Sequence, residues 1–222
     1  MIIYGSTISP FVRKVVAVAH EKGVAVEVRN AGMGRGGVEF EEASPFGKMP
    51  ALRDPGADGG RDFTISDSSA IAHYLEAKHP EPALIPADPI GRARAIWWDE
   101  FADTILAGVG TKLFFNRFVG PKVLRTGGDA AVADAAERDE LPRVLAYLER
   151  TVPQSGFLVG DRLSLADIAV AAPFVNLSWV GATVDGARYP RTAAYLDGIL
   201  ARPSLAEPAA RDGQIVERLM AS

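Results

Sequence analysis

The sequence predicts a small α/β domain followed by an all-α helical-bundle domain. Strand and helix patterns alternate over residues 1–78, four prolines crowd residues 79–90, and only helical periodicity follows over residues 91–222. Because proline continues neither a helix nor a strand ladder, we expect the chain to change direction in the proline-rich segment. We therefore predict a linker at 79–90 that separates two domains.

The chain begins with the pattern of a βαβ unit. Residues 2–4 predict a short buried strand, and residues 10–22 place apolar side chains at helical spacing. Residues 24–28 alternate loosely as a second strand, which in such a unit runs parallel to the first. The glycine-rich residues 32–37 predict a mobile loop, and a short helix is expected around residues 39–43.

The second half of this domain has the pattern ββα. Residues 49–54 and 62–65 are prone to form strands, and the turn residues 55–60 between them predict a hairpin. Residues 68–78 then have helical periodicity. Together with the βαβ unit they predict a compact mixed domain for residues 1–78.

Beyond the linker the apolar residues recur at helical spacing in four segments, which are 91–117, 129–152, 165–180 and 190–201. Pro142 interrupts the second segment, so we expect a kink or a break there. Ser164 and Asp167 have the spacing of a capping box, in which the side chain of each residue accepts a hydrogen bond from the backbone N–H of the other. We interpret this pair as structural.

Composition limits the classes of function. The chain has 222 residues, 48% hydrophobic and 23% charged, as in an ordinary globular protein. A net charge of −4 without a long basic run argues against a nucleic-acid partner, and no apolar run is long enough for a signal peptide or a membrane span. We therefore expect a cytoplasmic protein that binds a small molecule.

The chain contains no cysteine, which excludes disulfides, thiolate metal sites and a thiol nucleophile of the protein's own. His20, His73 and His79 are the only histidines and lack metal-ligand spacing, so we expect no metal.

Three segments of the first domain match one family. They are SPFVRKV at residues 9–15, SPFGKMPAL at residues 44–52 and ISDSSAIAHYL at residues 65–75. With the all-α partner domain they resemble the cytosolic glutathione transferases, in the serine-type form of bacterial members. GFLVGD at 156–161 and ARPS at 201–204 also follow the family pattern, so the resemblance spans nearly the whole chain. It implies a thioredoxin-like first domain, glutathione as co-substrate and a role in detoxification, and leaves the class open.

The resemblance assigns glutathione binding to Lys48, Met49, Pro50, Asp67 and Ser68. In the family the proline matching Pro50 is cis, and it turns the backbone of the preceding residue toward the peptide-like ligand. Asp67 and Ser68 open a helix, whose N–H groups favour a carboxylate while Asp67 suits an ammonium group. The simpler alternatives are an ordinary proline at a strand start, a plain N-cap at Ser68 and a surface lysine at Lys48.

Conjugation requires glutathione as a thiolate, and lowering a thiol pKa by about two units takes roughly 2.7 kcal/mol. A helix N-terminus with one donated hydroxyl hydrogen bond supplies about this amount. Pro10 suits the first helical position and places Ser9 at the N-cap, where a hydroxyl can accept from the helix and donate to the thiolate. Ser9 is therefore the favoured catalytic residue, and Thr7, Tyr4 and Ser6 are the alternatives.

The helical domain is expected to supply the pocket for a small hydrophobic electrophile. Candidate pocket residues are Phe11, Trp98, Phe115 and Arg117. The resemblance also implies a homodimer, in which the aromatic residue at Phe46 enters the second subunit.

Family members with cysteine at the position of Ser9 act as thiol transferases. Because this chain has no cysteine, the resemblance favours conjugation, or glutathione-dependent peroxidase, isomerase or dehalogenase activity. The alternative from another class is a non-catalytic or regulatory binding module with the same fold.

Overall fold

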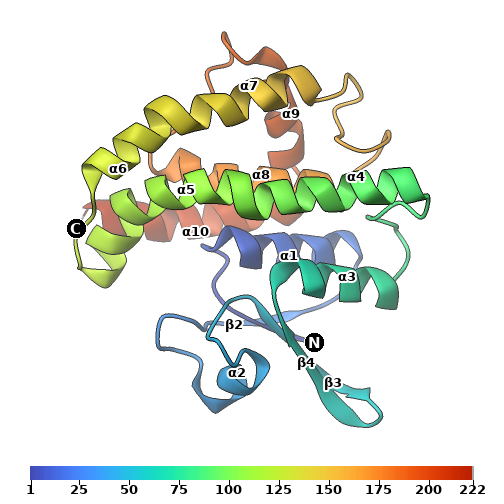
Figure 1. Ribbon diagram of the computed structural model, residues 1–222. Coiled ribbons are helices and arrows are strands. Elements are labelled where there is room, and N and C mark those ends of the chain that lie inside the picture. Colours follow the sequence, from blue (N-terminus) through green and yellow to red (C-terminus); the bar gives the residue numbers. More distant parts are fainter. Residues whose placement is uncertain (222) are drawn as a thin grey trace. The chain divides into compact units, whose positions relative to one another are not determined.

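The computed structural model describes residues 1–221, and the chain divides into two compact units. Unit 1 spans Met1–Ile85 and unit 2 begins at Pro86. The division falls inside the segment 79–90 that was predicted as a linker. Figure 1 shows that unit 1 contains the sheet and that unit 2 is helical. No helix within residues 1–221 is long and apolar enough to cross a bilayer.

The sheet of unit 1 has four strands in the order β2-β1-β3-β4. Their bounds are Ile2–Tyr4 for β1, Glu27–Arg29 for β2, Ala51–Asp58 for β3 and Arg61–Ser66 for β4. The strand β1 pairs in parallel with β2 and antiparallel with β3, and β3 pairs antiparallel with β4. The predicted parallel βαβ unit is therefore confirmed, although β2 starts three residues later than the loose alternation indicated.

Three helices belong to this sheet, namely α1 (Pro10–Glu21), α2 (Gly37–Ala43) and α3 (Ser68–Lys78). Side chains alternate between the two faces of a strand. Along β3, Ala51 packs with Phe40 of α2, whereas Asp54 accepts a hydrogen bond of 2.6 Å from Tyr74 of α3. The helices α1 and α3 pack against each other. The sheet thus has α2 on one face and α3, with α1, on the other.

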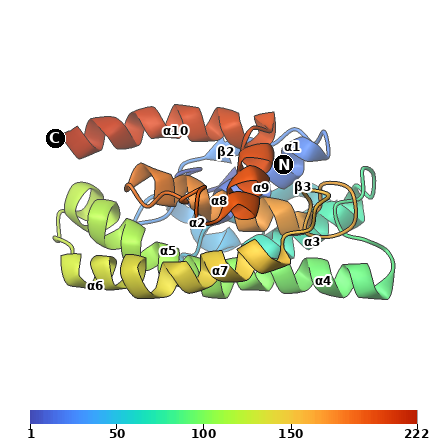
Figure 2. The same ribbon diagram turned by 90° about the horizontal axis from the view of Figure 1, so that it is seen from above.

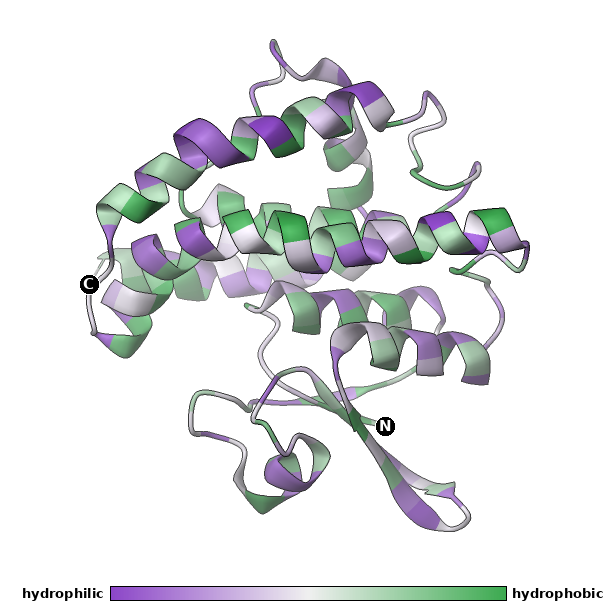
Figure 3. Ribbon diagram, in the orientation of Figure 1, coloured by the Kyte–Doolittle hydropathy of each residue, from purple (hydrophilic) through white to green (hydrophobic). Residues whose placement is uncertain are grey.

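The hairpin is longer than predicted. We expected a loop over residues 55–60, but β3 continues to Asp58 and β4 begins at Arg61. Only Gly59 and Gly60 form the turn, with φ values of 57° and 89°. Both values lie in the left-handed region that a two-residue hairpin turn requires and that glycine adopts at low cost. Figure 3 shows strongly hydrophilic stretches in the outer half of this hairpin, and residues 55–62 are exposed.

The first half of the predicted linker belongs to unit 1 because side chains hold its backbone. The ammonium group of Lys22 lies 2.5 Å from Glu76 Oε2 and donates to the carbonyl oxygens of His79 and Pro82 at 2.8 and 2.9 Å. The carboxylate of Glu76 also accepts from the backbone N–H of Ile85 at 3.1 Å. One buried ion pair therefore holds residues 79–85 against helices α1 and α3.

Unit 2 is built from two long helical runs and three further helices. The first run joins α4 (Pro89–Glu100), the π-helical η1 (Phe101–Leu106), α5 (Ala107–Phe114) and the π-helical η2 (Phe115–Leu124). The second joins α6 (Ala130–Ala135), the π-helical η3 (Ala136–Glu140) and α7 (Leu141–Thr151). The remaining helices are α8 (Leu165–Trp179), α9 (Pro190–Leu200) and α10 (Pro203–Ala221).

Two expectations for unit 2 need correction. The first helical run extends to Leu124 instead of ending at residue 117, and α10 was not predicted. Prolines obscured both patterns: Pro121 lies inside η2, and Pro203 and Pro208 lie within α10. Pro142 lies where η3 passes into α7, so the run changes there from π-helical to α-helical and does not break.

The helix α8 forms the core of unit 2. Every residue from Leu165 to Leu177 is buried, and α8 packs against α4, α5, α9 and α10, between which it runs in Figure 2. A helix that is apolar all round is stable only when other helices surround it. The predicted capping box is confirmed, because the side chains of Ser164 and Asp167 each bond the backbone of the other residue. Asp167 also accepts from the backbone N–H of Leu158 at 2.8 Å.

Candidate active site

Three segments of unit 1 that are far apart in sequence meet beside the first turns of α1 and α3. A Cβ atom placed on Gly5, just before the Ser6–Ser9 loop, would lie 3.3 Å from the Cβ atom of Met49. The backbone N–H of Asp67 donates to the carbonyl oxygen of Pro50 at 3.3 Å. The loop before α1, the Met49–Pro50 pair and the start of α3 are therefore neighbours, as a shared ligand would require.

The Met49–Pro50 peptide bond is cis, as the resemblance implies. Pro50 is buried and Met49 is half-buried. Within residues 1–221, no hydrogen bond engages the backbone N–H or the carbonyl oxygen of Met49. A backbone N–H and carbonyl without partners can pair with the backbone of an extended peptide. Met49 can therefore bind the backbone of a peptide-like ligand.

Asp67, rather than Ser68, is the N-cap of α3, so the plain N-cap interpretation of Ser68 is wrong. The Oδ1 atom of Asp67 accepts from the backbone N–H groups of Ser69 and Ala70, both at 3.0 Å. Ser68 is the first helical residue and is only 4% exposed. Asp67 has a φ of 97°, a strained value for a residue with a side chain, and such values concentrate at functional sites. Its Oδ2 atom makes no hydrogen bond within the described chain, which leaves it free for a cationic group.

Ser9 lies at the N-cap of α1, and Pro10 is in the first turn, as predicted. The backbone carbonyl of Ser9 accepts from the N–H of Arg13 at 3.0 Å. However, the Ser9 hydroxyl makes no capping hydrogen bond, so the expectation that it accepts from the helix is wrong. Ser9 has an extended backbone with φ −70° and ψ 129° and is half-buried. Its hydroxyl hydrogen and the unpaired N–H groups of the first turn are therefore available to an anion.

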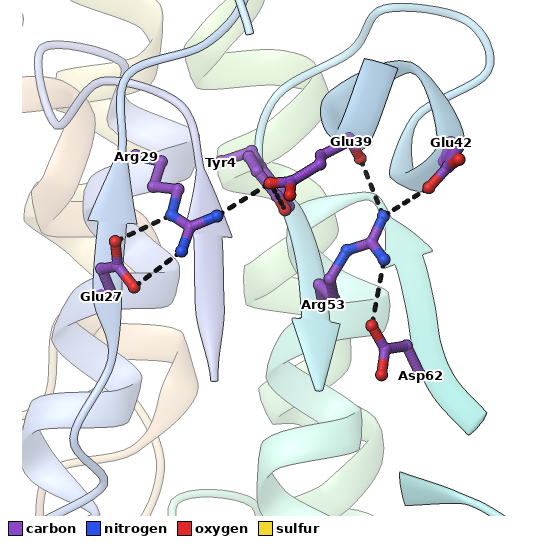
Figure 4. A network of polar contacts seen from close by, with 7 residues as sticks. All are labelled: Tyr4, Glu27, Arg29, Glu39, Glu42, Arg53 and Asp62. Carbon is purple, nitrogen blue, oxygen red and sulfur yellow. Dashed lines mark hydrogen bonds and ion pairs between the residues drawn. The ribbon is translucent and has the colours of Figure 1, made fainter. Parts of the chain in front are cut away.

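The three alternatives to Ser9 differ in their surroundings. Tyr4 is 1% exposed, and its hydroxyl donates to Glu39 Oε2 at 3.2 Å, as Figure 4 shows. Burial and then this hydrogen bond raise the pKa of Tyr4, which disfavours the phenolate. Thr7 is buried, and the Ser6 hydroxyl oxygen accepts from the N–H of Ile8 at 3.4 Å. Among these hydroxyls the geometry favours Ser9.

The candidates for the electrophile pocket differ in their surroundings. Trp98 is 7% exposed and packs in an aromatic cluster with Phe101 and Tyr147, at ring distances of 5.2 and 5.7 Å. The guanidinium of Arg117 makes ion pairs with two carboxylates, Asp134 at 2.9 Å and Glu137 at 2.6 Å. Trp98 and Arg117 therefore have structural contacts.

The other two candidates are more accessible. Phe115 is 40% exposed and Phe11 is half-buried. A cavity of about 530 Å³ in unit 2 lies elsewhere, between residues 152–157 and α9. No group of three or more metal-ligating side chains occurs within residues 1–221.

Sequence reasoning missed a cluster of charged residues on the α2 face of the sheet, shown in Figure 4. Arg53 of β3 donates to Glu42 of α2 and to Asp62 of β4, and Arg29 of β2 donates to Glu39 of α2. The alternation of β3 could have placed Arg53 on the same face as Ala51. It could not show that α2 lies over that face.

Family models match both units of the chain. The N-terminal domain of glutathione S-transferase matches residues 3–83, and its C-terminal domain matches residues 109–203. A glutathione S-transferase from Hyoscyamus muticus is 30% identical over 211 residues, which cover 92% of this chain and 95% of that protein. The chain belongs to the glutathione S-transferase family. The resemblance inferred from three short segments is thereby confirmed, together with the thioredoxin-like and all-α fold of this transferase.

Solved structures agree with this assignment. A glutathione S-transferase from Methylobacterium radiotolerans, solved in complex with glutathione sulfonate, is 30% identical to this transferase with a TM-score of 0.73. The match covers 94% of this chain and 93% of that one. A relative with another name is FtsZ-localized protein A of Caulobacter vibrioides, which is 29% identical over 64% of this transferase and 62% of its own length.

Proposed function

We propose that this transferase binds glutathione in unit 1 and uses Ser9 to hold its sulfur as a thiolate, which attacks a small hydrophobic electrophile. The observation that carries the proposal is the uncommitted hydroxyl of Ser9 at the start of α1, in a loop that adjoins Met49 and the Asp67 segment. Family membership supports the reaction, and this local geometry supports the assignment of the hydroxyl.

The energies involved are sufficient for thiol activation. A hydrogen bond to a charged group contributes about 1.5 to 3 kcal/mol, and a helix N-terminus adds about 0.3 to 1 kcal/mol for an adjacent anion. Each pKa unit corresponds to about 1.4 kcal/mol, so the two effects together lower a thiol pKa by roughly one to three units. That range moves a thiol from mostly protonated to substantially ionised at neutral pH.

Glutathione offers groups that suit each neighbour of Ser9. Its peptide backbone pairs with the backbone of Met49, and its γ-glutamyl ammonium group faces the Oδ2 atom of Asp67. The γ-glutamyl carboxylate faces Ser68 at the N-terminus of α3, where the positive end of the helix dipole favours an anion. Lys48 is exposed and can pair with the second carboxylate.

The electrophile is bound by residues of the helical unit, for which Trp98, Phe115 and Arg117 stay predicted contacts, with Phe11 from unit 1. The chain acts in the cytoplasm as a homodimer with a role in detoxification. Phe46 is 90% exposed, which suits its predicted role as an aromatic key between subunits.

The variant Ser9→Ala tests the proposal. Turnover of glutathione with a chlorinated nitroarene should fall about 10- to 100-fold, because the variant loses a hydrogen bond to a charged group. Retention on immobilised glutathione should persist, and the thiolate absorbance of the bound tripeptide should titrate at higher pH than in the wild type. Ser6→Ala is the matched control and should keep wild-type turnover.

Two outcomes would contradict the proposal. Unchanged turnover in Ser9→Ala would move the catalytic role to Thr7 or another hydroxyl of the loop. A wild-type protein that neither binds glutathione nor shows a thiolate band would instead favour the non-catalytic binding module.

A further inference from the structure

Seven side chains form a polar network on the α2 face of the sheet, outside the predicted contacts to glutathione (Figure 4). We call this set the charged cluster; its members are Tyr4, Glu27, Arg29, Glu39, Glu42, Arg53 and Asp62. It joins all four strands to α2, since Arg29 and Tyr4 hold Glu39 while Arg53 holds Glu42 and Asp62.

Arg53 makes the most connections in this cluster. Its side chain is 15% exposed and donates to Glu42 Oε2 at 2.8 Å, to the backbone carbonyl of Glu39 at 3.2 Å and to Asp62 Oδ2 at 3.0 Å. The planar guanidinium presents several donors in fixed directions, so one group can hold three acceptors at once. Arg53 thus ties β3 to α2 on one side and to β4 on the other.

The helix α2 depends on its contacts with the sheet, which are the apolar packing of Phe40 and Ala43 and the bonds that Tyr4, Arg29 and Arg53 make to it. It has seven residues, of which only Phe40 and Ala43 are buried. Its N-cap is Gly36, which provides no side-chain cap. A helix of two turns is not stable by itself in water, so its position depends on tertiary contacts. The contacts of Arg53 therefore add to this packing and to the bonds of Tyr4 and Arg29 in holding α2 on the sheet.

The segment that follows α2 contains two of the predicted glutathione contacts. Residues 44–50 run from the end of α2 to the start of β3 and include Lys48 and Met49. Inside the segment the Ser44 hydroxyl donates to the carbonyl of Lys48 at 2.7 Å, and the Gly47 N–H donates to the carbonyl of Ser44 at 2.9 Å. Arg53 lies two residues beyond Ala51 and bonds α2, so it holds both ends of this segment.

We propose that Arg53 is a positioning residue for glutathione: its guanidinium holds α2 against β3 and thereby sets the position of the Met49 backbone and of Lys48. The inference rests on the proposed function of this segment. A segment whose ends are fixed loses less conformational freedom when a ligand orders it, so binding is stronger than with loose ends. Arg53 acts on binding and does not touch the reacting sulfur.

The test compares Arg53→Met with Arg61→Met. Arg61 is on the same hairpin, and its ion pair with Asp58 is largely exposed, so its loss should change neither kinetic constant. In Arg53→Met the KM for glutathione should rise about tenfold, while kcat at saturating glutathione should stay within about twofold of the wild type. Arg53→Lys can keep one of the carboxylate contacts and should have an intermediate KM.

Hydrogen exchange provides a readout that needs no activity. The amide N–H of Ser44 donates to the carbonyl oxygen of Phe40 in α2, and the amide N–H of Gly47 donates to the carbonyl oxygen of Ser44. Both amide protons should exchange faster in Arg53→Met and, to a smaller extent, in Glu42→Gln. They should exchange at the wild-type rate in Arg61→Met. If Arg53→Met fails to fold, the same comparison is made with Arg53→Lys and Glu42→Gln.

The possible results distinguish a failure of the positioning role of Arg53 from a failure of the proposed function. If the wild type binds glutathione but KM and amide exchange are the same in the Arg53 and Arg61 variants, the positioning role is wrong and the proposed function stands. If kcat falls as much as KM rises, Arg53 does more than position the segment and the proposal is also wrong. A wild type that does not bind glutathione overturns both.

Discussion

At the scale of single residues, the buried charge of Lys22 holds residues 79–85 in unit 1, so that unit 2 begins after them. The Lys22 side chain is fully buried against Glu76 and the carbonyl oxygens of His79 and Pro82. Removing one partner of a buried ion pair leaves the other charge without compensation, which costs more than the pair itself contributes. The proline-rich segment predicted a change of direction, but not that an ion pair would hold its first half.

We therefore expect Lys22→Met to lower the free energy of unfolding by about 3 to 5 kcal/mol. Residues 79–85 should also become more sensitive to limited proteolysis, because two carbonyl oxygens lose their donor. Denaturant unfolding and mass mapping of the cut sites measure the two effects. The control is Lys112→Met, whose pair with Glu140 is about two-fifths exposed on each side and should contribute at most about 1 kcal/mol. Equal losses of unfolding free energy in the two variants would contradict the role of Lys22 in holding residues 79–85.

At the scale of elements, α9 is capped by a residue from another helix. Its sequence offers no capping side chain, since the N-cap is Tyr189. Instead the carboxylate of Glu149, in α7, accepts from the N–H groups of Arg191 and Thr192 at 3.0 and 2.9 Å and from the Thr192 hydroxyl at 2.9 Å. A carboxylate at a helix N-terminus satisfies unpaired donors and interacts favourably with the helix dipole.

This cap has a predictable pH dependence. Burial alone would raise the pKa of Glu149, but the hydrogen bonds from the backbone of Thr192 and Arg191 outweigh it and lower the pKa. A carboxylate with a lowered pKa stabilises the fold above its unfolded pKa, and this stability is lost as the pH falls through the folded value. Glu149→Gln should therefore be about 0.5 to 2 kcal/mol less stable at pH 7.

The difference between Glu149→Gln and the wild type should shrink as the solution is acidified. Thermal unfolding over a pH series measures it, with Glu207→Gln on the surface of α10 as the control. A difference that stays constant or grows toward acid would show that the carboxylate charge does not stabilise α9.

At the scale of the whole molecule, the most exposed large apolar side chain of residues 1–221 is Phe46. A buried aromatic anchor is a common source of binding energy at protein interfaces. If Phe46 is the key of a homodimer, Phe46→Ser should shift the wild-type dimer toward monomer at micromolar concentration, as measured by light scattering. Val38→Ser removes another exposed apolar side chain of unit 1 and should leave the dimer intact. A wild type that is monomeric would contradict the homodimer directly.

The sequence by itself determined the family, the order of the elements up to α9 and the three segments that meet beside the first turns of α1 and α3. Local rules were enough for these: proline at the start of α1, the capping box of α8 and the apolar periodicity are set by neighbours within a few residues. The same local signals failed where prolines interrupt helices, so α10 was not predicted.

Only the tertiary structure decided what each polar side chain does. Ser9 was expected to cap α1 with its hydroxyl, yet the hydroxyl is uncommitted, while Asp67 instead of Ser68 caps α3. Arg53 and Glu42 are eleven residues apart in sequence and meet because α2 folds over β3. Hydrogen bonds depend on distances of about 3 Å between groups that the chain brings together only when it folds, and no spacing along the sequence specifies them.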